Sequence, residues 1–339
     1  GYLMRQRSIS QLLVAVFILS SGASFCFAQI DALGLRFATA KPYDLTVCLA
    51  FSPDSRKILA CNNQGPVTVF QPPLGQKLGV FFSKKFVSQM VFSPQGGVVA
   101  GHCAERPDVF LLDDRDWKLK GSLQTANKSV NFIAFSSDGK YLAAACTDRS
   151  VFIWHFPTRR LLHEVKVPRS SPAIIQISPD SRLLAIASAS IEFYDLDRGV
   201  RSLTIPIDPD RYVGGIAFLD GGRLCAASVS RAKPPFEAAI QTWDTTTGVL
   251  KHSMGTGDEC PATLIPIAED RLITGSFQSG MIRLWEPKAS RQVASFSTGA
   301  NLGCLTLSPD CRVLACTLAP SDLRIWKVSD VFPEIRLPQ

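Results

Sequence analysis

A short turn phrase, Ser-Pro-Asp or a variant of it, recurs seven times along this chain of 339 residues. The equivalent positions are Asp54, Gln95, Asp138, Asp180, Gly221, Glu269 and Asp310, at intervals of 41, 43, 42, 41, 48 and 41 residues. A unit of about 42 residues cannot bury its own apolar faces, so it must pack against copies of itself. The repeat therefore restricts the chain to a repetitive architecture.

A second marker keeps step with the first. An aromatic or large apolar residue follows each turn phrase, namely Phe70, Leu111, Trp154, Tyr194, Trp243, Trp285 and Trp326. The offsets are 16, 16, 16, 14, 22, 16 and 16 residues. The longest offset and the longest interval fall in the same unit, so one insertion of about six or seven residues between Ser228 and Ile240 explains both.

Within each unit the apolar residues form short runs or alternate with a period of two, as in 132–135, 141–146, 151–154 and 161–165. Runs of this kind, separated by Gly, Pro, Asp and Ser, are typical of strands. Four strands and their turns fill one period and leave no room for a long helix. The sequence therefore predicts an all-β fold, a seven-bladed β-propeller of four-stranded antiparallel blades. We place the repeats near residues 45–82, 87–124, 129–166, 172–205, 213–254, 261–297 and 302–337.

Closing such a ring requires a strand from the far end of the chain. Apolar residues alternate in segment 33–38, ahead of the first unit, and we expect this segment to form the outer strand of the seventh blade. The alternative is segment 332–337 at the other terminus, where Pro333 removes a hydrogen-bond donor.

The amino terminus has the layout of a secretory signal peptide. Arg5 and Arg7 form a basic region, residues 12–19 an apolar centre, and residues 20–28 a small, polar exit. We therefore expect residues 1–28 to be removed and the protein to be exported, to a periplasm or to the outside of the cell.

Cleavage after Ala28 leaves residues 29–339 as the propeller domain. The alternative is a membrane anchor that stays uncleaved, because the 23 residues from Ser8 to Ile30 carry no charge and are long enough to cross a bilayer.

The composition argues against several classes of function. Lys and Arg number 36 against 29 Asp and Glu, and removal of Arg5 and Arg7 reduces the surplus from +7 to +5. A surplus this small, without clustered basic residues, does not favour nucleic-acid binding. No GxSxG, HExxH, P-loop, GxGxxG or CxxC motif occurs, and the chain has four histidines. We expect no catalytic residues, no metal site and no cofactor.

Seven of the ten cysteines recur at equivalent strand positions. These positions include Cys48, Cys61, Cys103, Cys146, Cys225, Cys304 and Cys316. A repeated position implies a repeated role, so we expect these thiols to fill small apolar slots between blades.

Two stretches, 147–154 (TDRSVFIW) and 240–244 (IQTWD), resemble the strand-ending phrases of WD40 repeats. The resemblance extends from Leu33 to about Leu337 and is to divergent, exported members of bacterial type. It implies a seven-bladed propeller that serves as a platform on which other proteins assemble.

The chain also departs from the family pattern. Only Trp243-Asp244 keeps the full dipeptide, and the Gly-His pair that usually precedes the innermost strand is missing from every unit. The buried His–Asp hydrogen-bond network of the family therefore cannot form. We expect these blades to depend on apolar packing and backbone ladders instead.

In a propeller, the loops after the second and fourth strands of the blades gather at one end of the central channel. Cations and aromatics predominate in these loops, and Arg and Tyr are favoured anchors of protein interfaces. The candidate partner-binding residues are Tyr43, Lys84, Lys85, Phe86, Lys128, Arg149, Arg211, Tyr212, Arg231, Lys233 and Phe236. We expect a peptide or protein segment of acidic or polar character to bind there. The alternative is that these are scattered, solvated loop residues.

The sequence thus predicts a non-catalytic scaffold for protein–protein interaction that acts outside the cytoplasm. We expect a monomeric propeller with a protein or peptide partner, no nucleic acid and, after signal cleavage, no membrane attachment. The alternative function is a propeller enzyme, a lactonase-like hydrolase or a cofactor-dependent dehydrogenase, with its site at the channel mouth.

Overall fold

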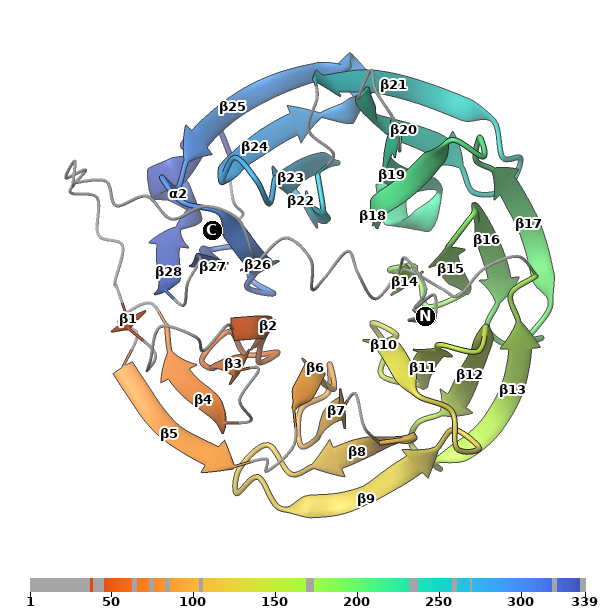
Figure 1. The fold of residues 1–339 in the computed structure, drawn as a ribbon, viewed down its shortest axis with the longest axis vertical. Coiled ribbons are helices and arrows are strands. Elements are labelled where there is room, and N and C mark those ends of the chain that lie inside the picture. Colours follow the sequence, from red (N-terminus) through yellow and green to blue (C-terminus); the bar gives the residue numbers. More distant parts are fainter. Residues whose placement is uncertain are drawn as a thin grey trace, which may run out of the picture. The chain divides into compact units, whose positions relative to one another are not determined.

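The chain divides into two units, Gly1–Leu33 and Gly34–Gln339. The computed structural model describes part of the second unit, residues 37–38, 46–62, 66–72, 76–82, 86–103, 106–168, 174–231, 237–257, 261–268, 270–318 and 322–335. Within this unit, seven four-stranded antiparallel sheets form a ring of blades (Figure 1). The predicted signal peptide lies outside the described residues.

Each of the first six blades is built from four consecutive strands. Blades 1 and 2 contain β2 (Thr46–Phe51), β3 (Ile58–Asn62), β4 (Pro66–Gln71), β5 (Gln76–Phe82), β6 (Val87–Phe92), β7 (Val99–Cys103), β8 (Asp108–Leu112) and β9 (Leu119–Gln124). Blades 3 and 4 contain β10 (Val130–Phe135), β11 (Tyr141–Cys146), β12 (Ser150–His155), β13 (Arg160–Lys166), β14 (Ile174–Ile177), β15 (Leu183–Ala187), β16 (Ser190–Asp195) and β17 (Arg201–Pro206).

Blades 5 and 6 contain β18 (Arg211–Leu219), β19 (Leu224–Arg231), β20 (Ala238–Asp244), β21 (Leu250–Gly257), β22 (Thr263–Ile267), β23 (Arg271–Gly275), β24 (Met281–Glu286) and β25 (Arg291–Ser297). Blade 7 contains β26 (Leu302–Leu307), β27 (Val313–Leu318), β28 (Asp322–Lys327) and β1 (Phe37–Ala38). The seven-bladed, four-stranded architecture predicted from the repeat is confirmed.

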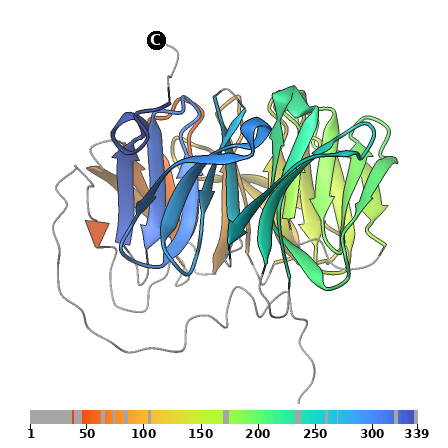
Figure 2. The same cartoon turned by 90° about the horizontal axis from the view of Figure 1, so that it is seen from above.

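The first strands of the blades line the inside of the ring. β2 contacts β6, and the contacts continue through β10, β14, β18, β22 and β26 back to β2. Neighbouring strands of a blade are antiparallel, so successive loops lie at alternate ends of the sheet, as the side view shows (Figure 2). We call the end with the loops after the second and fourth strands the docking face, and the end with the other loops the opposite face.

The ring closes through the amino-terminal side of the unit. Phe37 of β1 pairs with Leu323 of β28, and Ala38 pairs with Asp322. Residues 332–335, the described part of the alternative segment, form no strand and follow a short helix, α2 (Val328–Val331). The amide of Phe332 donates to the carbonyl of Val328, which closes a helical turn in place of a sheet ladder.

The apolar core is divided among the interfaces between blades. Ile153 of blade 3 and Ile186 of blade 4 are fully buried in one cluster, whereas Ile191 of blade 4 and Phe218 of blade 5 belong to the next. Burial of one such side chain stabilises the fold by about 1.5–3 kcal/mol. Mutual shielding of the blades is therefore the main source of their stability.

The cysteines have the packing role that their spacing predicts. The eight in the described part of the chain are free thiols, and six of them are buried. Cys48, Cys61 and Cys103, for example, belong to the cluster between blades 1 and 2.

The insertion lengthens blade 5. Its strands β18, β19, β20 and β21 have 9, 8, 7 and 8 residues. The predicted insertion falls between β19 and β20, and residues 232–236 within it lie outside the described part of the chain.

Candidate partner-binding site

The structure describes six of the eleven candidate residues. Arg211, Tyr212 and Arg231 lie on blade 5, Lys128 and Arg149 on blade 3, and Phe86 directly before β6 of blade 2. The others, Tyr43, Lys84, Lys85, Lys233 and Phe236, lie outside the described residues. The candidates therefore form two local groups on different blades, with Phe86 apart from both.

The blade 5 group is assembled by the hairpin of β18 and β19. Arg211 is the register partner of Arg231, and Tyr212 is the partner of Ser230. The backbone amide of Arg231 donates to the carbonyl of Glu237 over 3.0 Å, which holds the start of β20 beside the end of β19. The hairpin thus places two guanidinium groups and one phenol at the same edge of the docking face.

Both arginines of this group have acidic partners. The guanidinium of Arg231 donates from Nε to Oδ2 of Asp210 over 3.2 Å, and its Nη2 lies 3.1 Å from the same oxygen. Arg211 lies 3.6 Å from Oδ2 of Asp208 and 3.7 Å from Oε2 of Glu237. The edge therefore carries both signs of charge.

The acidic partners were missed in the sequence because Asp208 and Asp210 have the composition of an ordinary turn. Their one signal is spacing, since Asp208 stands three residues before Arg211.

A depression of about 450 Å³ lies beside Arg211. Its lining consists of Arg211, Glu237, Ala238, Ala239, Gln241, Ser253, Gly255 and Gly257. A Cβ atom added at Gly255 or Gly257 would meet no atom within 4 Å, so the missing side chains leave this space open. Tyr212, which is 38% exposed, stands in the same strand as Arg211.

On blade 3, Lys128 belongs to a polar network. Its Nζ pairs with the Glu164 carboxylate, donates to Oγ of Ser150 over 2.9 Å and lies 3.5 Å from Oδ2 of Asp148. Lys166 donates to the same Asp148 oxygen over 3.0 Å. The Lys128 Nζ also lies 4.9 Å from the ring centroid of Phe152, a cation–π distance.

The network lowers the pKa of Asp148. Burial raises the pKa of this carboxyl, but hydrogen bonds from Lys166 and Ser150 and the charge of Lys128 outweigh that effect and lower the pKa to about 2. In blade 3 this polar network adds to the apolar packing and the backbone ladders. A lysine from the loop before the innermost strand supplies the cation of a polar network there.

Arg149 lies outside this network. It has a left-handed backbone, with φ of 73°, and its guanidinium donates to the carbonyl of Pro168 over 3.2 Å. Arg149 is exposed, whereas the Lys128 side chain is only 21% exposed. Of the two blade 3 candidates, Arg149 is the more accessible to a partner.

The described residues show no group of three or more His, Cys, Asp or Glu side chains placed to hold a metal ion. Within the same ranges, no helix is long and apolar enough to cross a membrane. His102 and Cys103 are both buried in blade 2.

Comparison with known proteins gives a family match within the described part of the chain. Residues 117–155, which include β9 to β12, match the family "WD domain, G-beta repeat". The chain is 22% identical over 250 residues to "Periodic tryptophan protein 2" of Arabidopsis thaliana, an alignment that covers 72% of this chain and 27% of that protein. It is 26% identical over 209 residues to "WD repeat-containing protein WDS homolog" of the same plant, covering 59% and 38%.

The aligned part of this chain thus spans well under half of either relative. Both relatives are plant proteins, and the likeness to exported bacterial members stays a prediction. The chain is a seven-bladed β-propeller, and the matched repeat together with the WD-repeat relatives supports its place in the WD40 repeat family.

Proposed function

We propose that this propeller is a non-catalytic platform that binds a protein or peptide segment at the blade 5 edge of its docking face. The observation that carries the proposal is an open depression lined by Arg211, with an exposed tyrosine and a second arginine at the same edge of blade 5. Tyrosine and arginine are enriched among residues that dominate interface energy. Scaffolding of other proteins is also the usual role of WD40 propellers.

Arg211 is the centre of the proposed contact. Its two ion pairs, at 3.6 and 3.7 Å, are longer than hydrogen bonds, and a guanidinium has five N–H donors. Its donors are therefore available to a carboxylate of a partner. The present pairing also restrains the side chain, which reduces the entropy that binding costs.

Arg231 has a different role in this proposal. Its Nε already donates to Asp210 and its Nη2 forms an ion pair with the same carboxylate, so Arg231 is less available to a partner than Arg211. The partner that fits is an extended segment with a carboxylate for Arg211 and small or polar residues for the depression.

We further propose that binding takes place outside the cytoplasm. The support is the signal-like order of residues 1–28, and the test is detection of the mature amino terminus at Gln29 in an exported fraction. The enzyme alternative has no comparable support among the described residues.

Photo-crosslinking tests the docking edge directly. A benzophenone amino acid replaces Tyr212, and the matched control carries it at Arg223, whose side chain is 80% exposed on the opposite face of the same blade. We expect a discrete adduct from position 212 that disappears with Arg211→Ala, and no such adduct from position 223. The same adducts from both positions, or an adduct insensitive to Arg211→Ala, would contradict the proposal.

A further inference from the structure

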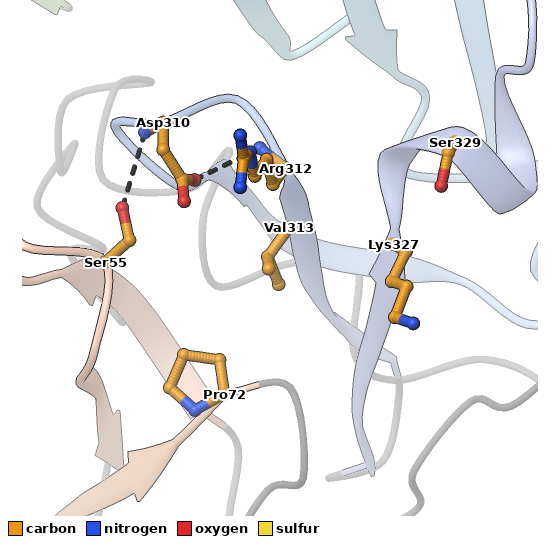
Figure 3. Close-up of a pocket in the computed structure, with 7 residues that line it drawn as sticks. All are labelled: Ser55, Pro72, Asp310, Arg312, Val313, Lys327 and Ser329. Carbon is orange, nitrogen blue, oxygen red and sulfur yellow. Dashed lines mark hydrogen bonds between the residues drawn. The ribbon is translucent and has the colours of Figure 1, made fainter. Parts of the chain in front are cut away.

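A second depression lies on the opposite face, at the seam between blades 7 and 1 where the ring closes (Figure 3). Its volume is about 420 Å³. It is lined by Ser55, Pro72, Asp310, Arg312, Val313, Lys327 and Ser329. This depression shares no lining residue with the depression at the blade 5 edge.

Two cations, Arg312 and Lys327, line the seam. Arg312 precedes β27 and Lys327 ends β28, and both residues are exposed. Among the described residues, neither side chain forms an ion pair or a hydrogen bond. The N–H donors of both side chains are therefore available to a ligand.

The carboxylate of Asp310 also lines the site, but it already accepts hydrogen bonds from the protein. It accepts hydrogen bonds at Oδ1 from Oγ of Ser308 over 2.5 Å and from the amide of Arg312 over 3.1 Å. Burial raises the pKa of this carboxyl, but these hydrogen bonds and the Arg312 charge outweigh it and lower the pKa. The lining thus keeps a surplus of positive charge, two cations against one carboxylate.

Ser55 adds a hydroxyl from the other blade. Its Oγ accepts a hydrogen bond from the backbone amide of Asp310 over 3.3 Å. Among the described residues, the Ser55 hydroxyl proton has no acceptor. Figure 3 shows Ser55 and Asp310 facing each other across the seam. Blade 1 thus adds one hydroxyl to a lining that is otherwise polar mainly on the blade 7 side.

The seventh blade differs from the others at one of these positions. The residue after the aromatic or large apolar marker is Gln71, Leu112, His155, Asp195, Asp244, Glu286 or Lys327. Only blade 7 places a lysine there. In blade 6 the equivalent Glu286 pairs with Arg291 over 2.5 Å, so the same position takes part in an ion pair.

We propose that the seam binds a phosphate group. Arg312 presents a planar fork that matches two oxygens of a tetrahedral oxyanion, and Lys327 supplies a point charge to a third. Ser55 offers a hydroxyl on the blade 1 side of the same depression. The volume leaves room for a substituent, so the site accepts a phosphate monoester as well as free phosphate.

The test measures binding of inorganic phosphate and of O-phosphoserine to the purified chain at constant ionic strength, by titration calorimetry. The variants are Lys327→Gln and Arg312→Gln, and the matched control is Arg182→Gln, an exposed arginine at the equivalent turn position of blade 4. Circular dichroism and thermal unfolding without phosphate show that each variant is folded.

We expect saturable binding that falls at least tenfold in either seam variant and is unchanged in Arg182→Gln. Tighter binding of O-phosphoserine than of phosphate would identify a monoester as the ligand, and the reverse would identify the free ion. Binding that is absent, or equal in the wild type and both seam variants, would overturn the proposal.

Discussion

Ser55 and Asp310 are 255 residues apart in the sequence, yet the Ser55 hydroxyl accepts a hydrogen bond from the backbone amide of Asp310 over 3.3 Å. This hydrogen bond joins the first blade to the seventh. It lies beside the apolar cluster in which Leu49 and Ile58 of blade 1 pack against Ala315 and Ile325 of blade 7. The ends of the propeller are thus held by packing and by a specific polar contact.

Ser55→Ala removes that contact without changing the backbone requirement at this position. We expect the free energy of unfolding to fall by about 1 kcal/mol, the usual net value of one hydrogen bond. Urea unfolding should show a lower midpoint with an unchanged slope, because the ring unfolds as one unit. A midpoint equal to that of the wild type would show that the contact contributes nothing to closure.

Position 280 requires glycine because of its backbone conformation and because of a neighbouring carbonyl group. Its φ is 63°, and a Cβ atom there would overlap the carbonyl oxygen of Ala300. We expect Gly280→Ala to destabilise the fold by about 2–4 kcal/mol, because a backbone atom cannot move aside as a side chain can. Gly255→Ala, where a Cβ atom meets nothing within 4 Å, serves as the control in the same thermal unfolding experiment and should be nearly neutral. Equal losses in both variants would refute this explanation.

His102 makes stability depend on pH. The side chain is 1% exposed, and burial lowers its pKa from 6.5 to about 4. The unfolded chain binds the proton more tightly, so this group stabilises the fold above pH 6.5, and that contribution is lost as the pH falls toward 4. The full difference is about 3 kcal/mol.

His102→Gln should remove this part of the pH dependence. The measurement is the free energy of unfolding of both proteins between pH 7.5 and pH 4. Parallel curves for wild type and variant would mean that His102 is not the group responsible.

Asp148→Asn tests the polar network of blade 3. The carboxylate accepts from Lys166 and Ser150, so the variant should lose about 1 kcal/mol at neutral pH, a value reduced by the solvent that reaches this side chain. Since the folded pKa is depressed to about 2, the advantage of the wild type should persist above the ordinary value of 3.8 and vanish as the pH falls through 2. Asp116→Asn, which breaks the exposed pair with Lys118, is the control and should change stability little. A wild-type advantage that survives at pH 2 would rule out this role for Asp148.

The fold was largely predictable from the sequence because the same sequence markers recur in every blade. The Ser-Pro-Asp turns and aromatic markers occur once per blade, so seven blades could be counted before any contact was known. The segment after Lys327 could not be assigned, since a helical turn and a strand both tolerate Val328–Val331 and the choice depends on packing of Phe332 against blade 6.

The sites were much less predictable. Lys128 pairs with Glu164, which is 36 residues away in the sequence, and Arg211 pairs with Glu237 of the next hairpin. A local sequence pattern therefore cannot predict either ion pair. Loop composition alone therefore overstated how much free positive charge the docking face carries. Lys327 stood out only once β28 was known to border the closing seam.

The central claim is that partners bind at the blade 5 edge, and a comparison of affinities tests it most directly. The partner recovered by crosslinking at position 212 is titrated against wild type, Arg211→Ala combined with Tyr212→Ala, and Arg223→Ala. We expect a loss of at least tenfold in affinity for the double variant and none for Arg223→Ala. Equal affinities of all three proteins would contradict it.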